Sequence, residues 1–213
     1  MQKLSSQLKI GLDEMGLAAK QSQFQQLLDL VDLLLRWNKK INLTSITKPH
    51  EVISKHILDS LSMVPHISGD NILDVGTGAG FPGLPLAIML PDTQFTLLDS
   101  NRKKLTFIQH VITKLGLENV RATHSRIQDH HSDRAYSAIT ARAFADLNDL
   151  LNWLPEVYDA HTQILAMKGK MPEKELESLR SGLLASQWTI HSIVKLNVPG
   201  LDAERCVIKL IQQ

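Results

Sequence analysis

The chain has 213 residues, of which 43% are hydrophobic and 21% charged, and its formal net charge is +1. This composition is that of an ordinary soluble globular protein with enough apolar residues for a full core. It excludes a strongly basic protein, so a bound nucleic acid would need a local basic face. The single cysteine, Cys206, excludes an internal disulfide and a cysteine-only metal site, and it fits a reducing cytoplasm.

The first 66 residues carry helical patterns. A helix is predicted over 4–15, apolar residues recur at three- and four-residue steps over 24–35, and a third helix starts near Pro49. Polar residues interrupt 1–15, so we expect no N-terminal signal, and the longest apolar run, 84–90, is too short to span a membrane. We expect an all-helical extension, residues 1–66, whose apolar faces pack on the domain that follows, residues 67–213.

From residue 71 onward, apolar runs alternate with helical patterns, which favours a mostly parallel sheet covered on both faces. Strands are predicted at 72–75, 94–98, 120–124, 138–141, 163–167, 188–196 and 205–211. Helices are predicted at 84–90, 102–115, 146–158 and 173–184. The turn signal Pro199-Gly200 joins the last two strands in a hairpin. The prediction is an α/β protein with a Rossmann-like sheet of about seven strands, a C-terminal antiparallel hairpin and an N-terminal all-helical extension.

The stretch 71–88 holds a strand, a glycine-rich turn and a helix, the arrangement that places a nucleotide-like ligand against a helix N-terminus. Two interpretations of its glycines compete. Gly78, Gly80 and Gly83 match the dinucleotide spacing G-x-G-x-x-G. The run D-x-G-x-G-x-G that begins at Asp74 instead resembles the first motif of Rossmann-like S-adenosylmethionine-dependent methyltransferases.

In the methyltransferase interpretation the loop holds a methionine tail, with Asp74 near its amine. A second acid is expected about 20 residues on, at the end of the next strand, to bind ribose hydroxyls, and Asp99 takes that place. The terminal hairpin also favours this interpretation, because a dinucleotide fold usually continues with parallel units. The ligand should lie beyond the carboxyl ends of the strands.

Several blocks, in order along nearly the whole chain, resemble the RsmG/GidB family of bacterial 16S ribosomal RNA guanine-N7 methyltransferases. The blocks are Trp37-Asn38-Lys39-x-x-Asn42-Leu43-Thr44-Ser45, His56-x-x-Asp59-Ser60, Asp74-Val75-Gly76-Thr77-Gly78-Ala79-Gly80-Phe81-Pro82-Gly83, Leu98-Asp99-Ser100, Arg142-Ala143-Phe144 and Met167-Lys168-Gly169. The resemblance implies S-adenosylmethionine as methyl donor and a guanine in a decoding-site loop of small-subunit RNA as acceptor.

Together with the glycine motif, the resemblance gives a set of candidate cofactor residues: Gly76, Gly78, Phe81, Asp99, Ile127, Gln128 and Arg142. The chain departs from the family pattern at one of them. The family usually has an acidic residue where this chain has Gln128. An amide can still accept a hydrogen bond from the adenine amino group, so we expect weakened rather than absent recognition.

The implied reaction needs no general base, because a sulfonium methyl is already activated and guanine N7 has a lone pair and no proton to lose. In-line alignment supplies much of the acceleration. Arg142 and Lys168 are the candidates for positioning, and the alternative for Arg142 is an ion pair with an acid such as Asp146. Lys and Arg bind phosphates without reading sequence. The candidate RNA contacts are Arg36, Lys39, Arg126, Lys168, Lys170 and Arg205.

Other residues have simpler interpretations. Trp37 is expected to pack against its helix surroundings rather than stack on a base. His56 and Asp59 share a helical face and could bind a metal, but a structural hydrogen bond is favoured because no third ligand is evident, so we expect no metal site. The pair His130-His131 lies in a polar loop and is expected to be solvated, and Cys206 is expected in a buried strand.

The sequence thus predicts a cytoplasmic, monomeric methyltransferase that acts on 16S ribosomal RNA or the small ribosomal subunit. Two alternatives stay open: an S-adenosylmethionine-dependent enzyme with a small-molecule or protein acceptor, and a non-catalytic assembly factor that binds cofactor and RNA. An NAD-dependent oxidoreductase is disfavoured by the position of Asp74 and by the hairpin.

Overall fold

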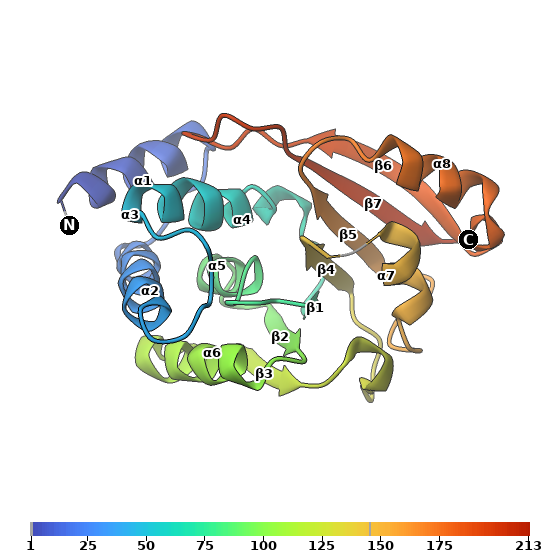
Figure 1. Cartoon of the computed structure of the whole chain (residues 1–213), viewed down its shortest axis with the longest axis horizontal. Coiled ribbons are helices and arrows are strands. Elements are labelled where there is room, and N and C mark those ends of the chain that lie inside the picture. The colour runs from blue at the N-terminus through green and yellow to red at the C-terminus, as the bar shows by residue number, and fades with distance from the viewer. Residues whose placement is uncertain (1, 145) are drawn as a thin grey trace.

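The computed structural model describes residues 2–144 and 146–213; Met1, the first residue of the predicted extension, and Ala145 lie outside them. Within this range seven strands form one sheet in the order β3-β2-β1-β4-β5-β7-β6 (Figure 1). The strands are β1 (Asn71–Val75), β2 (Gln94–Asp99), β3 (Val120–His124), β4 (Ala138–Arg142), β5 (Gln163–Lys168), β6 (Trp188–Lys195) and β7 (Cys206–Gln212). The first five are parallel, and β7 runs antiparallel to both β5 and β6. The predicted sheet and its terminal antiparallel pair are confirmed.

The helices cover both faces of this sheet. They are α1 (Gln2–Glu14), α2 (Gln21–Asn38), α3 (Pro49–Val52), the π-helical segment η1 (Ile53–Leu58), α4 (Asp59–Leu61), α5 (Gly83–Met89), α6 (Arg102–Leu115), α7 (Leu147–Trp153) and α8 (Glu173–Ser181). Short 3₁₀ turns occur at η2 (Val64–His66), η3 (Ile127–Asp129) and η4 (Leu183–Ser186). No helix in the described ranges is long and apolar enough to cross a membrane.

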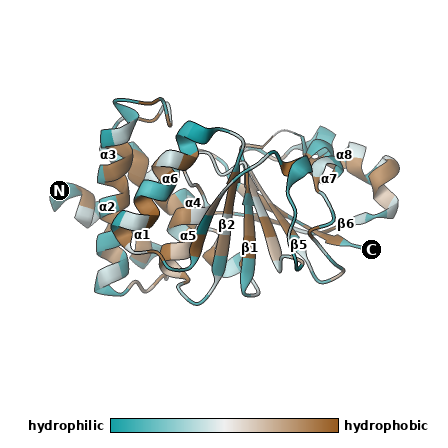
Figure 2. Ribbon diagram, turned by 90° about the horizontal axis from the view of Figure 1, so that it is seen from below, coloured by the Kyte–Doolittle hydropathy of each residue, from teal (hydrophilic) through white to brown (hydrophobic). Residues whose placement is uncertain are grey.

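Alternation along each strand divides the core into two clusters, one on each face of the sheet. Ile72 and Leu97 belong to the cluster that contains α5 and α6, whereas their neighbours Leu73 and Leu98 belong to the cluster that contains α7 and α8. Figure 2 shows the hydrophobic colouring of the strands between these helices. Because both faces are buried, the functional surface of the sheet lies at the ends of its strands.

The N-terminal helices extend the first of these clusters. Helix α2 packs on α5 and α6, and α1 packs on η1. The contact is polar as well as apolar, since the Gln23 amide donates to the carbonyl of Ile88 at 2.9 Å and the Gln26 amide to that of Leu115 at 2.8 Å. Leu27 and Leu34 of α2 are fully buried. The apolar face predicted over 24–35 therefore packs against α5 and α6.

Two predicted helices end several residues earlier in the structure. The helix predicted over 146–158 stops at Trp153, because Pro155 lacks an N–H and disfavours helical backbone at the residue before it. The helix predicted over 173–184 stops at Ser181, where Gly182 is extended. The connection between β6 and β7 is the segment 196–205, which contains the predicted turn Pro199-Gly200, with Gly200 at φ +71°.

Candidate functional site

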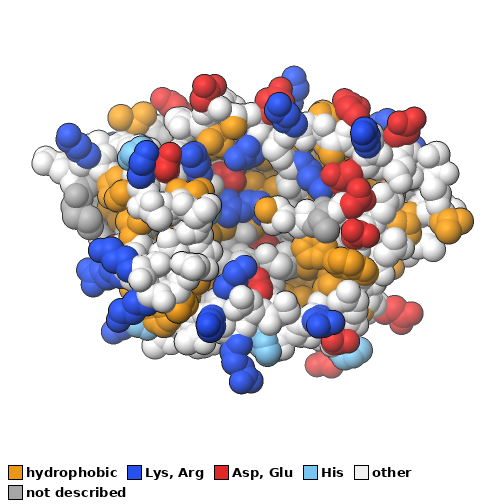
Figure 3. Space-filling view, viewed as in Figure 1, with side chains coloured by type: hydrophobic (Ala, Val, Ile, Leu, Met, Phe, Trp, Pro, Cys, Tyr) orange, Lys and Arg blue, Asp and Glu red, His pale blue; other side chains and the backbone are white. Residues whose placement is uncertain are grey.

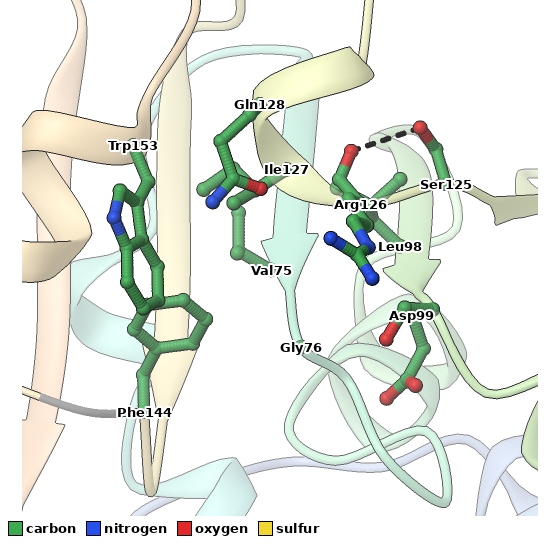
Figure 4. A pocket seen from close by; sticks show the side chains of 11 residues that line it. Val75, Gly76, Leu98, Asp99, Ser125, Arg126, Ile127, Gln128, Phe144 and Trp153 are labelled. Carbon is green, nitrogen blue, oxygen red and sulfur yellow. Dashed lines mark hydrogen bonds between the residues drawn. The ribbon is translucent and has the colours of Figure 1, made fainter.

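Two cavities open at the carboxyl ends of the strands, on the face shown in Figure 3, where Lys and Arg side chains gather around a hollow beside a hydrophobic patch. The first cavity has a volume of about 410 Å³, within the usual range for small-molecule sites. Its lining residues come from β1, β2, the segment after β3, the segment after β4, and α7 (Figure 4): Val75, Gly76, Leu98, Asp99, Ser100, Ser125, Arg126, Ile127, Gln128, Phe144 and Trp153.

The glycine loop after β1 forms one edge of this cavity. Gly76 and Gly78 have φ values of +63° and +62°, which side chains rarely adopt, and a Cβ on Gly76 would lie 3.1 Å from the Phe144 ring. The N–H of Gly78 donates to Oδ2 of Asp99 at 2.8 Å, and the N–H of Asn101 donates to its Oδ1 at 2.8 Å. The Asp99 carboxylate is thereby fixed at the end of β2, at the cavity wall.

Asp74 is not at the cavity surface, contrary to the expectation that it lies near a ligand amine. It is fully buried, and its carboxylate accepts hydrogen bonds from Thr77 Oγ1, from the N–H of Gly83 at 3.0 Å and from Thr140 Oγ1 at 3.0 Å. Burial raises the pKa of Asp74 to about 6, although these hydrogen bonds lower it. Asp74 therefore anchors the glycine loop from beneath, away from the cavity surface.

The opposite side of the first cavity is apolar and aromatic. Phe144 and Trp153 meet edge to face, with ring centroids 5.8 Å apart and planes at 77°. Figure 4 shows them across the cavity from Asp99 and Arg126, with Gln128 between. The sequence pattern did not single out Trp153, which lies inside the longer helix predicted over 146–158. Pro155 was the available signal, because a proline two residues after Trp153 predicts that the helix ends at this tryptophan.

The second cavity, of about 380 Å³, lies between the strand ends and the N-terminal helical segment. It is lined by Ile46, Lys55, His56, Asp59, Arg142, Ala143, Met167, Lys168, Gly169 and Arg205. Asp59 Oδ2 accepts from Arg142 Nη1 at 2.9 Å, and Asp59 Oδ1 accepts from Arg205 Nε at 2.7 Å. Arg142 is therefore ion-paired, as one interpretation held, but with Asp59 and not with Asp146, which caps α7.

His56 connects this cavity to the loop that follows α2. Its Nδ1 lies 3.1 Å from Arg142 Nη2, and its Nε2 lies 2.9 Å from Thr44 Oγ1. Because a guanidinium only donates, Nδ1 must accept, which assigns the proton to Nε2 and leaves the imidazole neutral. Burial and the Arg142 charge lower the pKa of His56 to about 3. The predicted structural role of His56 and Asp59 agrees with these bonds.

The structure sorts the predicted site residues into groups. Gly76, Asp99, Ile127 and Gln128 line the first cavity, together with Arg126, which was expected only as an RNA contact. Arg142, which the resemblance gives as a cofactor residue, is not in the walls of the first cavity but lines the second, together with Lys168 and Arg205. The remaining three basic candidates, Arg36, Lys39 and Lys170, are exposed and outside both cavities.

Two predicted residues lie beside the cavities rather than in their walls. Phe81 is buried and stacks on His56, with ring centroids 4.6 Å apart, while Arg142 lies over the Phe81 ring at 5.4 Å. Gly78 bonds to Asp99 from the loop tip. Lys168 forms an ion pair with Glu175 of α8 at 2.7 Å.

Three of the remaining residues have structural roles. Trp37 is half-buried against Phe107, with centroids 5.7 Å apart, as predicted. His130 was expected to be solvated, which is wrong: it is buried, 2.9 Å from the Tyr136 hydroxyl. Cys206 is buried in β7, as predicted. Among the described residues no group of three or more His, Cys, Asp or Glu side chains could hold a metal ion.

The sequence has relatives among known proteins. A family model named GidB, described as rRNA small subunit methyltransferase G, matches residues 23–208. A protein of Alteromonas mediterranea named ribosomal RNA small subunit methyltransferase G is 43% identical over 209 residues, covering 98% of this chain and 97% of the relative. One of the same name from Idiomarina loihiensis is 42% identical over 205 residues, covering 96% and 97%.

Solved structures match the fold at lower identity. An S-adenosylmethionine-dependent methyltransferase from Aquifex aeolicus has a TM-score of 0.59 at 18% identity, covering 83% of this chain and 98% of that one. TYW2 from P. horikoshii, solved in complex with MeSAdo, has a TM-score of 0.57 at 13% identity, covering 74% and 62%. At this identity the likeness concerns the fold alone.

Proposed function

The chain belongs to the GidB family of small-subunit ribosomal RNA methyltransferases, and on that premise we propose that it transfers a methyl group from S-adenosylmethionine to N7 of a guanine in the decoding-site loop of 16S ribosomal RNA. The observation that carries the proposal is the pairing of two cavities at one edge of the sheet. One has the chemistry of a nucleoside site, and the other is lined by arginine and lysine.

The first cavity fits the cofactor by the chemistry of its walls. The Asp99 carboxylate at the end of β2 would accept hydrogen bonds from the two ribose hydroxyls. Leu98, Ile127 and Phe144 would pack on the flat adenine ring, and the Gln128 carbonyl would accept from its amino group. The fit is tight at Gly76, where a Cβ would strain the backbone and press on Phe144.

The chemistry needs positioning rather than proton transfer. When bound, the cofactor supplies a sulfonium methyl group that is already activated. Guanine N7 has a free lone pair, so no side chain has to remove a proton. The protein's task is to hold the two reacting atoms in line, which supplies much of the acceleration in such reactions. A site without an evident general base is consistent with this task.

Binding of the RNA would use local charge, since the chain has almost no net charge. Arg126 at the first cavity, Arg205 at the second, and the exposed Arg36, Lys39 and Lys170 supply cations for phosphate contacts. A protein with this substrate works where ribosomal subunits are assembled, in the cytoplasm.

The test is transfer of labelled methyl from S-adenosylmethionine to small ribosomal subunits and to their stripped RNA. Labelled N7-methylguanine is then mapped by strand scission. We expect one labelled guanine in the decoding-site loop, and the better of the two substrates tells when in assembly the enzyme acts. Absence of label on both, with S-adenosylhomocysteine binding intact, would contradict the proposal and favour another acceptor or a non-catalytic role.

A further inference from the structure

One buried carboxylate holds two arginines that are far apart in the chain. Asp59 of α4 is only 3% exposed, and it pairs with Arg142 at the end of β4 and with Arg205 just before β7. The two guanidiniums are more exposed, at 18% and 24%. Asp59 is therefore more deeply buried than the two arginines, and all three residues line the second cavity.

The charges in this cavity do not balance. One carboxylate faces two permanently charged guanidiniums, so the cluster of Asp59, Arg142 and Arg205 has a net charge of about +1. The two lysines that line the cavity do not alter this balance, because Lys55 pairs with Glu51 at 3.0 Å and Lys168 with Glu175 at 2.7 Å. A partly buried positive charge of this kind favours a ligand with negative charge or strong acceptor oxygens.

The arginines are held by further bonds in fixed orientations. Arg142 Nη1 also donates to the carbonyl of Lys55 at 3.2 Å, and its Nη2 to His56 at 3.1 Å. Arg205 donates through Nε to Asp59 and through Nη1 to the carbonyl of Glu204 at 2.8 Å. Among the described residues, Arg205 Nη2 has no acceptor, so its donors are available to a ligand.

A single step of the backbone separates the two cavities. Ala143 lines the second cavity, and its neighbour Phe144 lines the first. Ala143 has φ +51°, the only positive value at a residue other than glycine in the described ranges. Non-glycine residues in this conformation are uncommon and concentrate at functional sites. Consecutive residues of the chain thus contribute to the walls of both cavities.

We propose that the second cavity receives the target nucleotide and that Asp59 is a positioning residue, which orients Arg142 and Arg205 toward acceptor oxygens of that nucleotide. This inference rests on the proposed function. The oxygens concerned are those of the phosphate and O6 of guanine, because N7 must stay free for the methyl group. Met167 and Ile46 give the cavity an apolar surface against which the base packs. The N-terminal helical segment thus belongs to the active site.

The first test compares Asp59→Asn with wild type in methyl transfer to small-subunit RNA. The amide cannot hold two guanidiniums, so we expect the turnover number to fall by about 100-fold, as for a reacting group displaced by about 1 Å. The KM for RNA should stay equal or fall, since the variant is more positive. S-adenosylhomocysteine affinity should stay within about twofold of wild type, because the first cavity does not contain Asp59.

Asp13→Asn is the matched control, since Asp13 also pairs with a cation but lies exposed on α1. A folded Asp59→Asn protein with turnover within twofold of wild type would overturn the inference. Because loss of Asp59 leaves two arginines unpaired and can destabilise the fold, Arg205→Gln is the second variant. It should raise the KM for RNA and leave S-adenosylhomocysteine affinity unchanged. An unchanged KM and turnover would contradict the proposal.

A photocrosslink locates the nucleotide directly. RNA carrying 6-thioguanosine at the mapped guanine is irradiated with the protein loaded with S-adenosylhomocysteine, and the linked peptide is identified by mass spectrometry. We expect links at residues of the second cavity, which are Ile46, Lys55, His56, Asp59, the stretches 142–143 and 167–169, and Arg205, whereas links elsewhere would overturn the inference. Wild-type protein that methylates no RNA refutes the proposed function instead, and that result is seen before any variant is made.

Discussion

His56 lies flat against Phe81, with the two ring centroids 4.6 Å apart and the planes within 11° of each other. One ring comes from the N-terminal helical segment and the other from the glycine-rich loop. The guanidinium of Arg142 contacts both, through a hydrogen bond to His56 and over the face of Phe81. Three separate parts of the chain therefore meet at one stack beside the two cavities, and substitutions at this edge are predicted to have separable effects.

Gly76→Ala should weaken cofactor binding and lower stability. The alanine would have to adopt the left-handed backbone conformation of Gly76, at a cost of about 1–2 kcal/mol. Its Cβ would also lie 3.1 Å from Phe144. Gly16→Ala is a matched control, since Gly16 has φ +65° with no atom within 4 Å of a Cβ. Calorimetric titration with S-adenosylhomocysteine should show that Gly76→Ala loses affinity by at least about tenfold, whereas Gly16→Ala keeps the affinity of wild type. Equal affinities would show that Gly76 does not border the cofactor.

Gln128→Glu should tighten cofactor binding. A carboxylate accepts a stronger hydrogen bond from the adenine amino group than an amide, by about 1 kcal/mol, which corresponds to about fivefold in Kd. Gln94→Glu, at the other end of the sheet, controls for the added charge. The gain should vanish with S-inosylhomocysteine, which has a carbonyl in place of the amino group. A gain that persists with this analogue would assign the effect to charge alone.

Asp74→Asn should loosen the glycine loop from below. An amide cannot accept from all three donors around it, so the unfolding free energy at pH 7 should fall by about 1–3 kcal/mol. Asp70→Asn, one exposed acid just before the same strand, should change it little. The folded pKa of about 6 exceeds the unfolded value, so wild type loses stability as the pH rises from about 4 to 6. The deficit of Asp74→Asn should therefore be larger at pH 4 than at pH 7.

His56→Asn should flatten the dependence of stability on pH. The folded pKa of about 3 lies below the ordinary value of 6.5, so the unfolded chain binds more protons between these values. Wild type should lose stability as the pH falls through this window, by up to about 1.4 kcal/mol per pH unit from this group. Urea unfolding at pH 7, 6 and 5 measures the slope. Asp74 contributes to the pH dependence with the opposite sign, but its contribution is the same in both proteins. Identical slopes of unfolding free energy against pH in wild type and His56→Asn would refute the lowered pKa of His56.

Arg142→Ala should abolish methyl transfer while the protein stays folded. Asp59 keeps Arg205 as a partner, so its carboxylate is not left unpaired. Arg134→Ala is the control, because Arg134 also pairs with an acid but on the exposed surface. Turnover and thermal unfolding are measured together. Wild-type turnover in Arg142→Ala would exclude this residue from the reaction.

The order of elements and the first cavity were predictable from the sequence, for a local reason. Strand, glycine turn and helix are set by neighbouring residues, and the parallel order of strands places Gly76, Asp99 and Gln128 at one edge. The ends of helices were harder to predict. Pro155 disfavours helical backbone at the residue before it, and hydrophobic periodicity does not reveal that effect.

The second cavity was not predictable in the same way. Asp59 and Arg205 are 146 residues apart, and Asp59 and Arg142 are 83 apart, so no periodicity links them. The sequence indicated each residue separately, as part of a block or a basic cluster. It also indicated the wrong partner for Arg142 and a wrong environment for His130. The packing of α4, which carries Asp59, on α5 brings these charges together.

The wall formed by Ala143 and Phe144 has a consequence for inhibition. A molecule that joins an adenosine-like group to a guanine nucleotide analogue through a short tether would need to cross only this one step of backbone. Its second group would then bind at a high effective concentration, so modest affinities for the two cavities would multiply. The length of the tether would determine how selectively the molecule binds this protein. It must match the path between the cavities past Ala143, whose backbone is left-handed.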